Sequence, residues 1–438
     1  MINLIMLWRW RLMEGGVKLI LRKTWRCFMK FKQSRGMLFL KERGIAFCLR
    51  HRLVKLRMKL LEKISLFVFR FFVKRVENYR FAVFFYGLSG HYALRKMFEF
   101  LGYEEVKIHD GEFSKCYYNA LRKLKGRGEY FLSFRFYDND LKDYTHNVTK
   151  VIKNTNILIL VRDPISRLKT LINHGHNIKP YELNALNSPI SLDIIRYEGN
   201  VKPSCNGLYD ALDTLAFNYY SVVKPLLDAG GGGILYIDTQ ELMPSCAFET
   251  FEKLSQGLEI SPPKKALKAK FEYKFWNPLS LLLPYYLYLS SKDFAKIPAI
   301  VLHVEENIIK NCQNSYVDIK SYILDPCDLH YENLAINVLK KNAHFILENE
   351  EILKALKNYF KQFVLILEEK VQLRQKYAIN EEAILSYLKE NHTTAKKLKD
   401  ILELELTHIK QVRPDIIASW KYYAEFEKIW EKLELSRS

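Results

Sequence analysis

Residues 156–170 read NILILVRDPISRLKT, and this stretch decides the fold class of the chain. The apolar run 156–161 has the length and composition of a buried strand. Asp163 then stands where a helix N-cap is expected, and Pro164 occupies the favoured first position of a helix. Arg162 is therefore expected at the carboxyl end of a parallel strand, where ligands bind in open α/β sheets.

The same pattern extends outward, because short apolar runs alternate with amphipathic segments from about residue 80 to residue 260. Strands are expected over residues 81–86, 105–108, 130–136, 156–161 and 234–237. Helices are expected between them, over residues 92–101, 114–124, 165–173, 209–227 and 247–254. Strands that alternate with crossover helices predict an α/β fold with a three-layer parallel sheet.

The first expected strand runs directly into the sequence GLSGHY at residues 87–92. A glycine-containing turn between a strand and a helix leaves backbone N–H groups free at the helix start, where an anion is favoured. Gly87 and Gly90 would allow the tight turn, and Ser89 and His91 could add hydrogen bonds. The turn is therefore a candidate phosphate site, although many such turns bind no ligand.

The positive charge of the chain is concentrated at its N-terminus. The 438 residues include 68 Lys and Arg against 49 Asp and Glu, but residues 1–80 alone carry 21 basic and four acidic residues. Residues 1–78 are expected to form basic, aromatic-containing helices that suit an anionic membrane surface. A solvated appendage that binds a partner is the alternative. Nucleic-acid binding is the least favoured of the three possibilities.

The remaining composition bears on domain organisation and location. Seven scattered cysteines without a C-x-x-C pair suggest reduced thiols, and neither a signal peptide nor a span of about 18 apolar residues is evident. We therefore expect a cytoplasmic protein, held peripherally at the inner membrane if residues 1–78 bind lipid, and no metal site. Three regions are expected: a basic helical segment over residues 1–78, a nucleotide-binding α/β domain over 79–262, and a cap and mainly helical region over 263–438. The last contains a candidate strand at 299–304 and helical spacing from about residue 334.

The pairing of the glycine turn with Arg162, Asp163 and Pro164 resembles the sulfotransferase family, a P-loop NTPase-type fold. Members use 3'-phosphoadenosine 5'-phosphosulfate (PAPS) as donor and carry a hydroxyl residue eight positions after the arginine, here Thr170. The resemblance implies that Arg162 and Thr170 hold the 3'-phosphate. It also implies that the turn from Gly87 to His91 holds the 5'-phosphosulfate. It covers roughly residues 80–260, including residues 234–242, which look like the family's strand-E-x-L region.

One departure from that family concerns the turn itself. The family's loop usually has a lysine or arginine that neutralises the bridging oxygen, and residues 87–89 contain none. Arg95, Lys96 and Arg135 are the candidates to replace it. The base that removes the acceptor proton would be His109, Glu112 or His91, with Asp110 lying beside the first two in sequence.

The resemblance implies a transferase that moves a sulfuryl group from PAPS to a hydroxyl of a surface glycan or a related acceptor. A glycosyltransferase or other glycan-modifying transferase is an alternative, because one fold hosts many reactions. A non-catalytic scaffold is the other alternative, and the missing basic residue favours it. The chain also resembles an uncharacterised epsilonproteobacterial family associated with surface-polysaccharide genes, which implies no established reaction.

Overall fold

The computed structural model describes most of residues 75–435. Outside the description lie residues 1–74, 109–112, 136–147, 150, 153–154, 175–176, 179–182, 191–196, 199–202, 215–216, 218, 229–232, 276–278, 280–281, 296, 307–314, 326–332 and 436–438. The basic segment expected over residues 1–78 thus falls almost wholly outside the described residues, and its membrane role stays a prediction. Among the helices that are described, none is long and apolar enough to span a bilayer.

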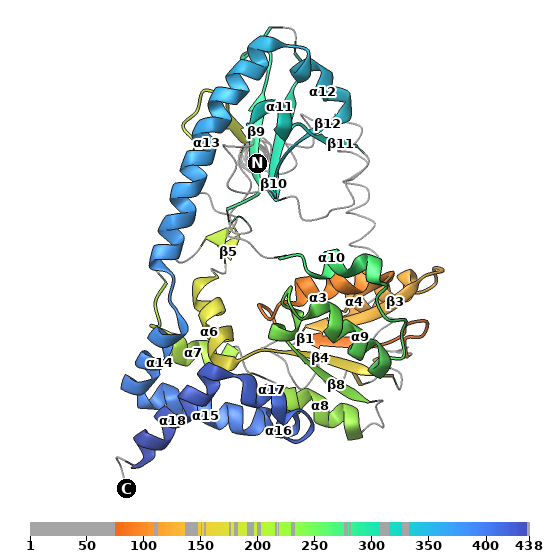
Figure 1. Cartoon of the computed structure of the whole chain (residues 1–438), viewed down its shortest axis with the longest axis vertical. Helices are drawn as coiled ribbons and strands as arrows, with labels where there is room; N and C mark the ends of the chain where they lie inside the picture. The colour runs from red at the N-terminus through yellow and green to blue at the C-terminus, as the bar shows by residue number, and fades with distance from the viewer. Residues whose placement is uncertain are drawn as a thin grey trace, which may run out of the picture. The chain divides into compact units, whose positions relative to one another are not determined.

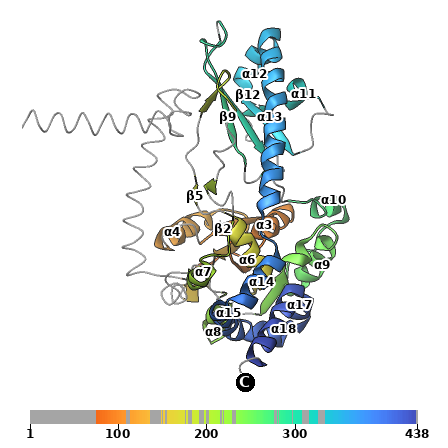
Figure 2. The ribbon, with the colours of Figure 1, turned by 90° about the vertical axis from the view of Figure 1, so that its left-hand side faces the viewer.

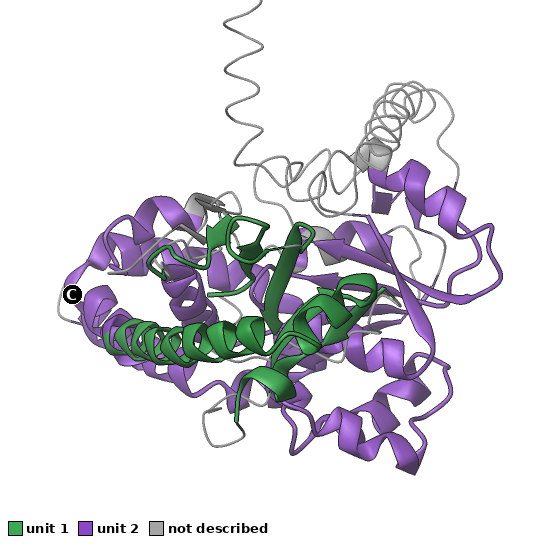
Figure 3. Ribbon diagram, turned by 90° about the horizontal axis from the view of Figure 1, so that it is seen from above, with its two compact units in different colours: residues 1–56, 176–199, 277–376 green, residues 57–175, 200–276, 377–438 purple. Residues whose placement is uncertain are grey.

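Packing divides the chain into two compact units, which Figure 3 colours separately. Unit 1 takes in residues 1–56, 176–199 and 277–376, and unit 2 takes in residues 57–175, 200–276 and 377–438. Each unit therefore joins segments that are far apart in the sequence. The glycine turn, Arg162 and the C-terminal helices all belong to unit 2.

Unit 2 is built on a five-stranded parallel sheet (Figure 1). Its strands are β1 (Ala82–Phe85), β2 (Tyr103–Lys107), β3 (Glu129–Arg135), β4 (Ile157–Val161) and β8 (Ile234–Asp238). They lie in the order β2-β3-β1-β4-β8, and every neighbouring pair is parallel. The α/β fold class expected from the sequence is confirmed, and all five expected strands form within two residues of their expected bounds.

Helices follow the strands in the expected alternation. They are α3 (His91–Phe100), α4 (Phe113–Lys123), α6 (Pro164–Asn173), α7 (Leu208–Thr214), α8 (Tyr219–Asp228) and α9 (Ala247–Gly257). A short helical turn, η1 (Thr239–Leu242), precedes α9, and two more, η2 (Lys265–Leu267) and α10 (Lys268–Phe271), follow it. The single helix expected over residues 209–227 is replaced by two, α7 and α8.

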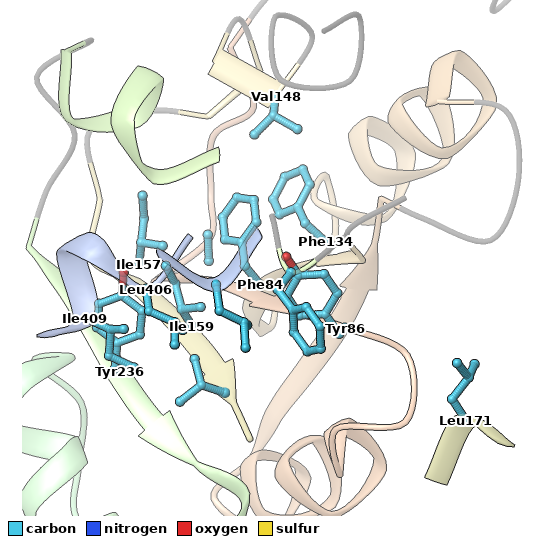
Figure 4. Close-up of a cluster of buried hydrophobic side chains, with 14 of the residues drawn as sticks. Phe84, Tyr86, Phe134, Val148, Ile157, Ile159, Leu171, Tyr236, Leu406 and Ile409 are labelled. Carbon is cyan, nitrogen blue, oxygen red and sulfur yellow. The ribbon is translucent and has the colours of Figure 1, made fainter. Parts of the chain in front are cut away.

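Side chains of the parallel sheet alternate between two apolar layers. Phe81 packs against Phe98 of α3 and Phe131 of β3, with ring centroids 4.7 and 5.4 Å apart, and so belongs to the layer of α3 and α9. Phe84 and Tyr86 point to the opposite face, whose buried cluster is drawn in Figure 4. Burial on both faces is typical of a parallel sheet, and each fully buried Phe contributes about 1.5–3 kcal/mol.

The C-terminal helices complete the second of these layers. They are α14 (Glu381–Glu390), α15 (His392–Glu405), α16 (Thr407–Val412), α17 (Pro414–Ser419) and α18 (Lys421–Leu435), which gather beside α6 in Figure 2. Leu398, Leu406, Ile409 and Trp420 are fully buried in the same cluster as the sheet residues. Helices α14 to α18 are therefore part of the core of unit 2 rather than an appendage.

Unit 1 contains a mainly antiparallel sheet in the order β11-β12-β10-β9-β6. Its strands are β6 (Leu183–Ala185), β9 (Tyr285–Leu289), β10 (Ile300–Glu306), β11 (Tyr316–Asp318) and β12 (Leu334–Leu339). Helices α11 (Lys320–Ile323), α12 (Lys340–Leu347) and α13 (Glu350–Tyr377) accompany them, and β5 (Asn177–Ile178) pairs with β7 (Tyr197–Glu198) separately.

One expectation for this region was wrong. The helical spacing expected from about residue 334 begins only at α12, because Leu334, Ile336 and Val338 alternate into a core shared with α13. Strand β9 also forms around Tyr285, where no strand was expected, and the candidate strand at 299–304 is confirmed as β10.

The strand order places a switch point in the parallel sheet. From β1 the chain moves to β2 on one side, whereas β4 and β8 lie on the other side. Ligands bind at the carboxyl ends of the strands where the order reverses, which here is between β1 and β4. The turn after β1 and Arg162 after β4 both occupy that edge.

Candidate functional site

The turn from Gly87 to Gly90 joins β1 to α3 in a compact left-handed form. Leu88 has a φ of 69° and Gly90 a φ of 81°, so only Gly90 adopts this conformation without steric cost. Gly90 is the N-cap of α3 and offers no side-chain cap, and the first turn of the helix holds no acidic residue. The positive end of the α3 dipole therefore faces the turn without a side-chain carboxylate or hydroxyl to cap it.

Ser89 lies inside this turn, and its hydroxyl has no hydrogen-bond partner among the described residues. The residue is completely buried, and its Oγ contacts no donor or acceptor within the described part of the chain. Leaving a buried polar group unpaired costs about 1–3 kcal/mol. The protein covers this hydroxyl completely, so a ligand reaches it only when the turn shifts.

Arg162 extends from the end of β4 to the same turn. One terminal nitrogen of its guanidinium donates a hydrogen bond of 2.9 Å to the Leu88 carbonyl oxygen. Among the described residues, no carboxylate forms an ion pair with it. Burial lowers the pKa of Arg162, and the more distant carboxylates of Glu381, Asp163 and Asp238 only partly oppose that effect. A partly buried cation without a paired anion suits a negatively charged ligand.

Arg135 supplies a second cation at the turn, from the end of β3. A Cβ placed on Gly87 would lie 2.7 Å from Nη2 of Arg135 and 3.2 Å from its Cζ. The guanidinium therefore occupies the space that a side chain on Gly87 would need. Register explains the meeting, because Arg135 lies directly beside Phe85 in the paired strands β3 and β1.

The other two cations considered for the turn, both on α3, pair with carboxylates of α3 and β2. Arg95 Nε lies 3.4 Å from Glu99 and its Nη1 lies 3.6 Å from Glu105, while its guanidinium sits 4.7 Å from the Tyr92 ring. Lys96 pairs with Glu99 at 2.5 Å. Of the three candidates, Arg135 is the one that the structure brings to Gly87.

Thr239 is a site residue that the sequence analysis missed. Its Oγ1 lies 2.8 Å from the Ser89 carbonyl oxygen and 3.0 Å from that of Val161, so the hydroxyl joins the turn to the end of β4. A Cβ placed on Gly90 would lie 3.0 Å from the methyl carbon of Thr239. A hydroxyl residue directly after a strand of the same sheet was the signal that could have identified it.

Thr170 lies on α6, and the structure does not link it to the turn. Its Oγ1 donates to the Ser166 carbonyl oxygen at 3.0 Å, and no described residue of the turn bonds to it. In the same helix, Ser166 and Lys169 both bind Glu381 of α14, at 2.8 and 2.7 Å. Lys169 and Ser166 hold the pKa of Glu381 down despite the opposing effect of burial, which is the largest single influence.

The three candidate bases have different outcomes. The His91 ring stacks on the Phe85 ring at 4.4 Å, at the first position of α3, so it lies directly beside the turn. His109 and Glu112, together with Asp110, fall outside the described residues. Their role as bases stays a prediction.

Two aspartates at the ends of β4 and β8 carry structural contacts at the same edge. Asp163 accepts backbone N–H groups of Ile165 and Ser166, at 2.8 and 3.2 Å, which confirms it as the N-cap of α6. Asp238 forms a capping box with Glu241 and accepts the indole N–H of Trp420 at 2.8 Å. Burial raises the pKa of Asp238 to about 6.

Comparison with known proteins gives limited matches. A family model described as a protein of unknown function (DUF2972) matches residues 236–433. No curated protein matches. Solved structures that match include mouse sulfotransferase SULT7A1 complexed with PAP, at 13% identity and a TM-score of 0.31, over 45% of this chain and 64% of that chain. The chain thus spans less than two thirds of that structure, and a likeness at this level transfers no residue roles.

Proposed function

We propose that this chain is a sulfotransferase-type enzyme that moves a sulfuryl group from PAPS to a hydroxyl of a glycan or related acceptor. The observation that carries the proposal is the convergence of anion-binding groups on one turn. Arg162 from the end of β4 and Arg135 from the end of β3 both reach the turn after β1. The same turn begins α3 without a side-chain cap and contains the Ser89 hydroxyl, which has no hydrogen-bond partner among the described residues. These groups fit a donor with several negative charges.

In this proposal Arg162 and Thr170 bind the 3'-phosphate, and the turn of Gly87, Ser89, Gly90 and His91 binds the 5'-phosphosulfate. A base, for which His91, His109 and Glu112 are the candidates, takes the proton of the acceptor hydroxyl. That oxygen forms a bond to sulfur while the bond from sulfur to the bridging oxygen breaks. The electron pair stays on the phosphate, and Arg135 stabilises the resulting charge.

The test is a calorimetric titration of 3'-phosphoadenosine 5'-phosphate (PAP), the spent donor, into the full chain. ATP and a UDP-sugar serve as comparison ligands, because a glycosyltransferase would prefer the latter. Selective PAP binding that Arg162→Ala weakens at least tenfold, or about 1.4 kcal/mol, is expected. Arg80→Ala is the matched control, since Arg80 precedes β1 at the opposite edge of the sheet and pairs with exposed Glu129.

Equal PAP affinity of wild type and Arg162→Ala would contradict the proposal. Binding of the UDP-sugar alone would support the glycosyltransferase alternative. A folded protein that binds none of the three ligands would support the scaffold alternative, for which the basic segment 1–78 would serve as the docking element at a partner or membrane surface.

A further inference from the structure

Asp163 caps two helices at once. Its Oδ1 accepts the first N–H groups of α6, and its Oδ2 accepts the N–H groups of Tyr422 and Tyr423, at 3.1 and 3.2 Å, at the start of α18. The residue is almost completely buried, with 3% of its surface exposed. Both helix starts direct their positive ends at one carboxylate, which stabilises the charge there.

A second aspartate fixes the same C-terminal segment at the neighbouring strand. Trp420, directly before α18, is fully buried and donates its indole N–H to Asp238 at the end of β8. Arg413 donates to the Tyr236 carbonyl oxygen at 2.7 Å and to Glu241 at 3.2 Å. Residues 413–423 are thus attached to the ends of both β4 and β8.

Asp163 is also the neighbour of Arg162 in the chain, and Arg162 binds the Leu88 carbonyl oxygen of the turn. The backbone of Asp163, with φ of −43° and ψ of 122°, sets the direction from β4 into α6. Any shift of Asp163 that releases α18 therefore moves the backbone that carries the Arg162 side chain. The same residue caps the C-terminal helix through its carboxylate and continues the backbone of the anion-binding arginine.

We propose that Asp163 is a positioning residue that couples the docking of α18 to anion binding at Arg162. The proposal deepens the proposed function and rests on it for the identity of the ligand. Coupling of two events is reciprocal, so a ligand at Arg162 must stabilise the docked α18 by the same factor by which docking strengthens its binding. The C-terminal helices thereby become a required part of the donor site.

The experiment compares the full-length wild type with Asp163→Asn, Asp163→Ala and Glu405→Ala. Asparagine is as good an N-cap as aspartate, but its single oxygen can cap only one of the two helices. Glu405 is the matched control, because it is a buried carboxylate of unit 2 that caps α8 through the N–H groups of Tyr220 and Ser221. Each protein is titrated with PAP and with inorganic pyrophosphate, and amide exchange of residues 421–426 is measured with and without ligand.

Asp163→Asn is expected to weaken ligand binding about tenfold and to speed exchange at the start of α18 by a similar factor. If the Asp163→Ala protein folds, its ligand binding should be weaker still and its exchange at the start of α18 faster still. Glu405→Ala is expected to lower the thermal midpoint while its ligand affinity stays within about twofold of the wild type. In the wild type, saturating ligand is expected to slow exchange of residues 421–426.

Rapid exchange of α18 in Asp163→Asn together with wild-type ligand affinity would overturn the coupling. So would α18 exchange in the wild type that does not respond to ligand. Binding of pyrophosphate without PAP would refute the proposed donor while still testing the coupling through pyrophosphate. If neither PAP nor pyrophosphate binds, both the proposed donor and the proposed coupling are overturned.

Discussion

Gly87 leaves the space in which the guanidinium of Arg135 lies, since a Cβ on Gly87 would come within 2.7 Å of Nη2 of Arg135. The glycine and the arginine are therefore one structural unit, although 47 residues separate them in the chain. This relationship gives the turn a basic group where its own sequence has none. Replacement of Gly87 by alanine therefore tests the placement of the Arg135 guanidinium.

We expect Gly87→Ala to reduce sulfuryl transfer by about ten- to hundredfold, because the new methyl group displaces the Arg135 guanidinium. The thermal midpoint should change little, since the displaced atoms are the end of a flexible side chain. Gly233→Ala is the matched control, because its Cβ would meet only Asn156 Oδ1, at an ordinary 3.5 Å.

The double variant Gly87→Ala/Arg135→Ala makes this prediction sharper. If the glycine acts through the arginine, the double variant loses no more activity than Arg135→Ala alone. Full additivity of the two losses in transfer assays would show that Gly87 serves the turn in a way that does not involve Arg135.

Ser89→Ala should stabilise the protein without ligand and weaken the binding of PAP. Removal of a buried hydroxyl that has no partner relieves a cost of about 1 kcal/mol, whereas the loss of a ligand contact lowers affinity. Urea unfolding and calorimetry measure the two effects. Ser133→Ala is the control, because the buried Ser133 hydroxyl donates to Glu105 at 2.8 Å and its loss should destabilise. Destabilisation of Ser89→Ala by a similar amount would contradict the prediction.

Thr239→Val should loosen the turn, because valine keeps the shape of threonine but loses the hydroxyl that binds the Ser89 and Val161 carbonyl groups. We expect a loss of about 1–2 kcal/mol in the free energy of unfolding and faster amide exchange in residues 88–91. Thr239→Ser keeps the hydroxyl and should retain most of the stability. If Thr239→Ser destabilises the protein while Thr239→Val does not, packing of the methyl group against Gly90 is the dominant contribution.

Asp238 should make the stability of unit 2 fall as the pH rises through about 6. Its folded-state pKa is raised from an ordinary 3.8 to about 6, so the folded state retains a proton that the unfolded state has already lost. The stabilising contribution is complete below pH 3.8 and disappears as the pH passes 6, with a magnitude on the order of 2–3 kcal/mol. Asparagine at position 238 does not titrate. The free energy of unfolding of the wild type minus that of Asp238→Asn should therefore fall by that amount between pH 4 and 7.

Urea unfolding at intervals across that range measures the difference. Asp415→Asn serves as control, because Arg413 holds the pKa of the Asp415 carboxyl below its usual value and its titration lies below this range. A wild-type advantage that is constant or grows with pH would refute the assignment to Asp238.

The local sequence determined the elements of the parallel sheet. The apolar run before Arg162, the N-cap Asp163 and Pro164 define a strand and a helix start through interactions within a few residues, and the structure confirms them. The same local rules failed at residues 334–339, where the residues that decide between helix and strand are those of α13 and the neighbouring strands.

Only the tertiary structure decided which groups meet at the turn. The sequence offers three equal candidates for the missing basic group, namely Arg135, Arg95 and Lys96. The register of β3 beside β1 brings Arg135 to the turn. Thr239 reaches Ser89 across 150 residues, and Asp163 reaches Tyr422 across 259. Contacts at such separations depend on how strands and helices pack, because a side chain's local sequence carries no information about a partner that folding brings to it.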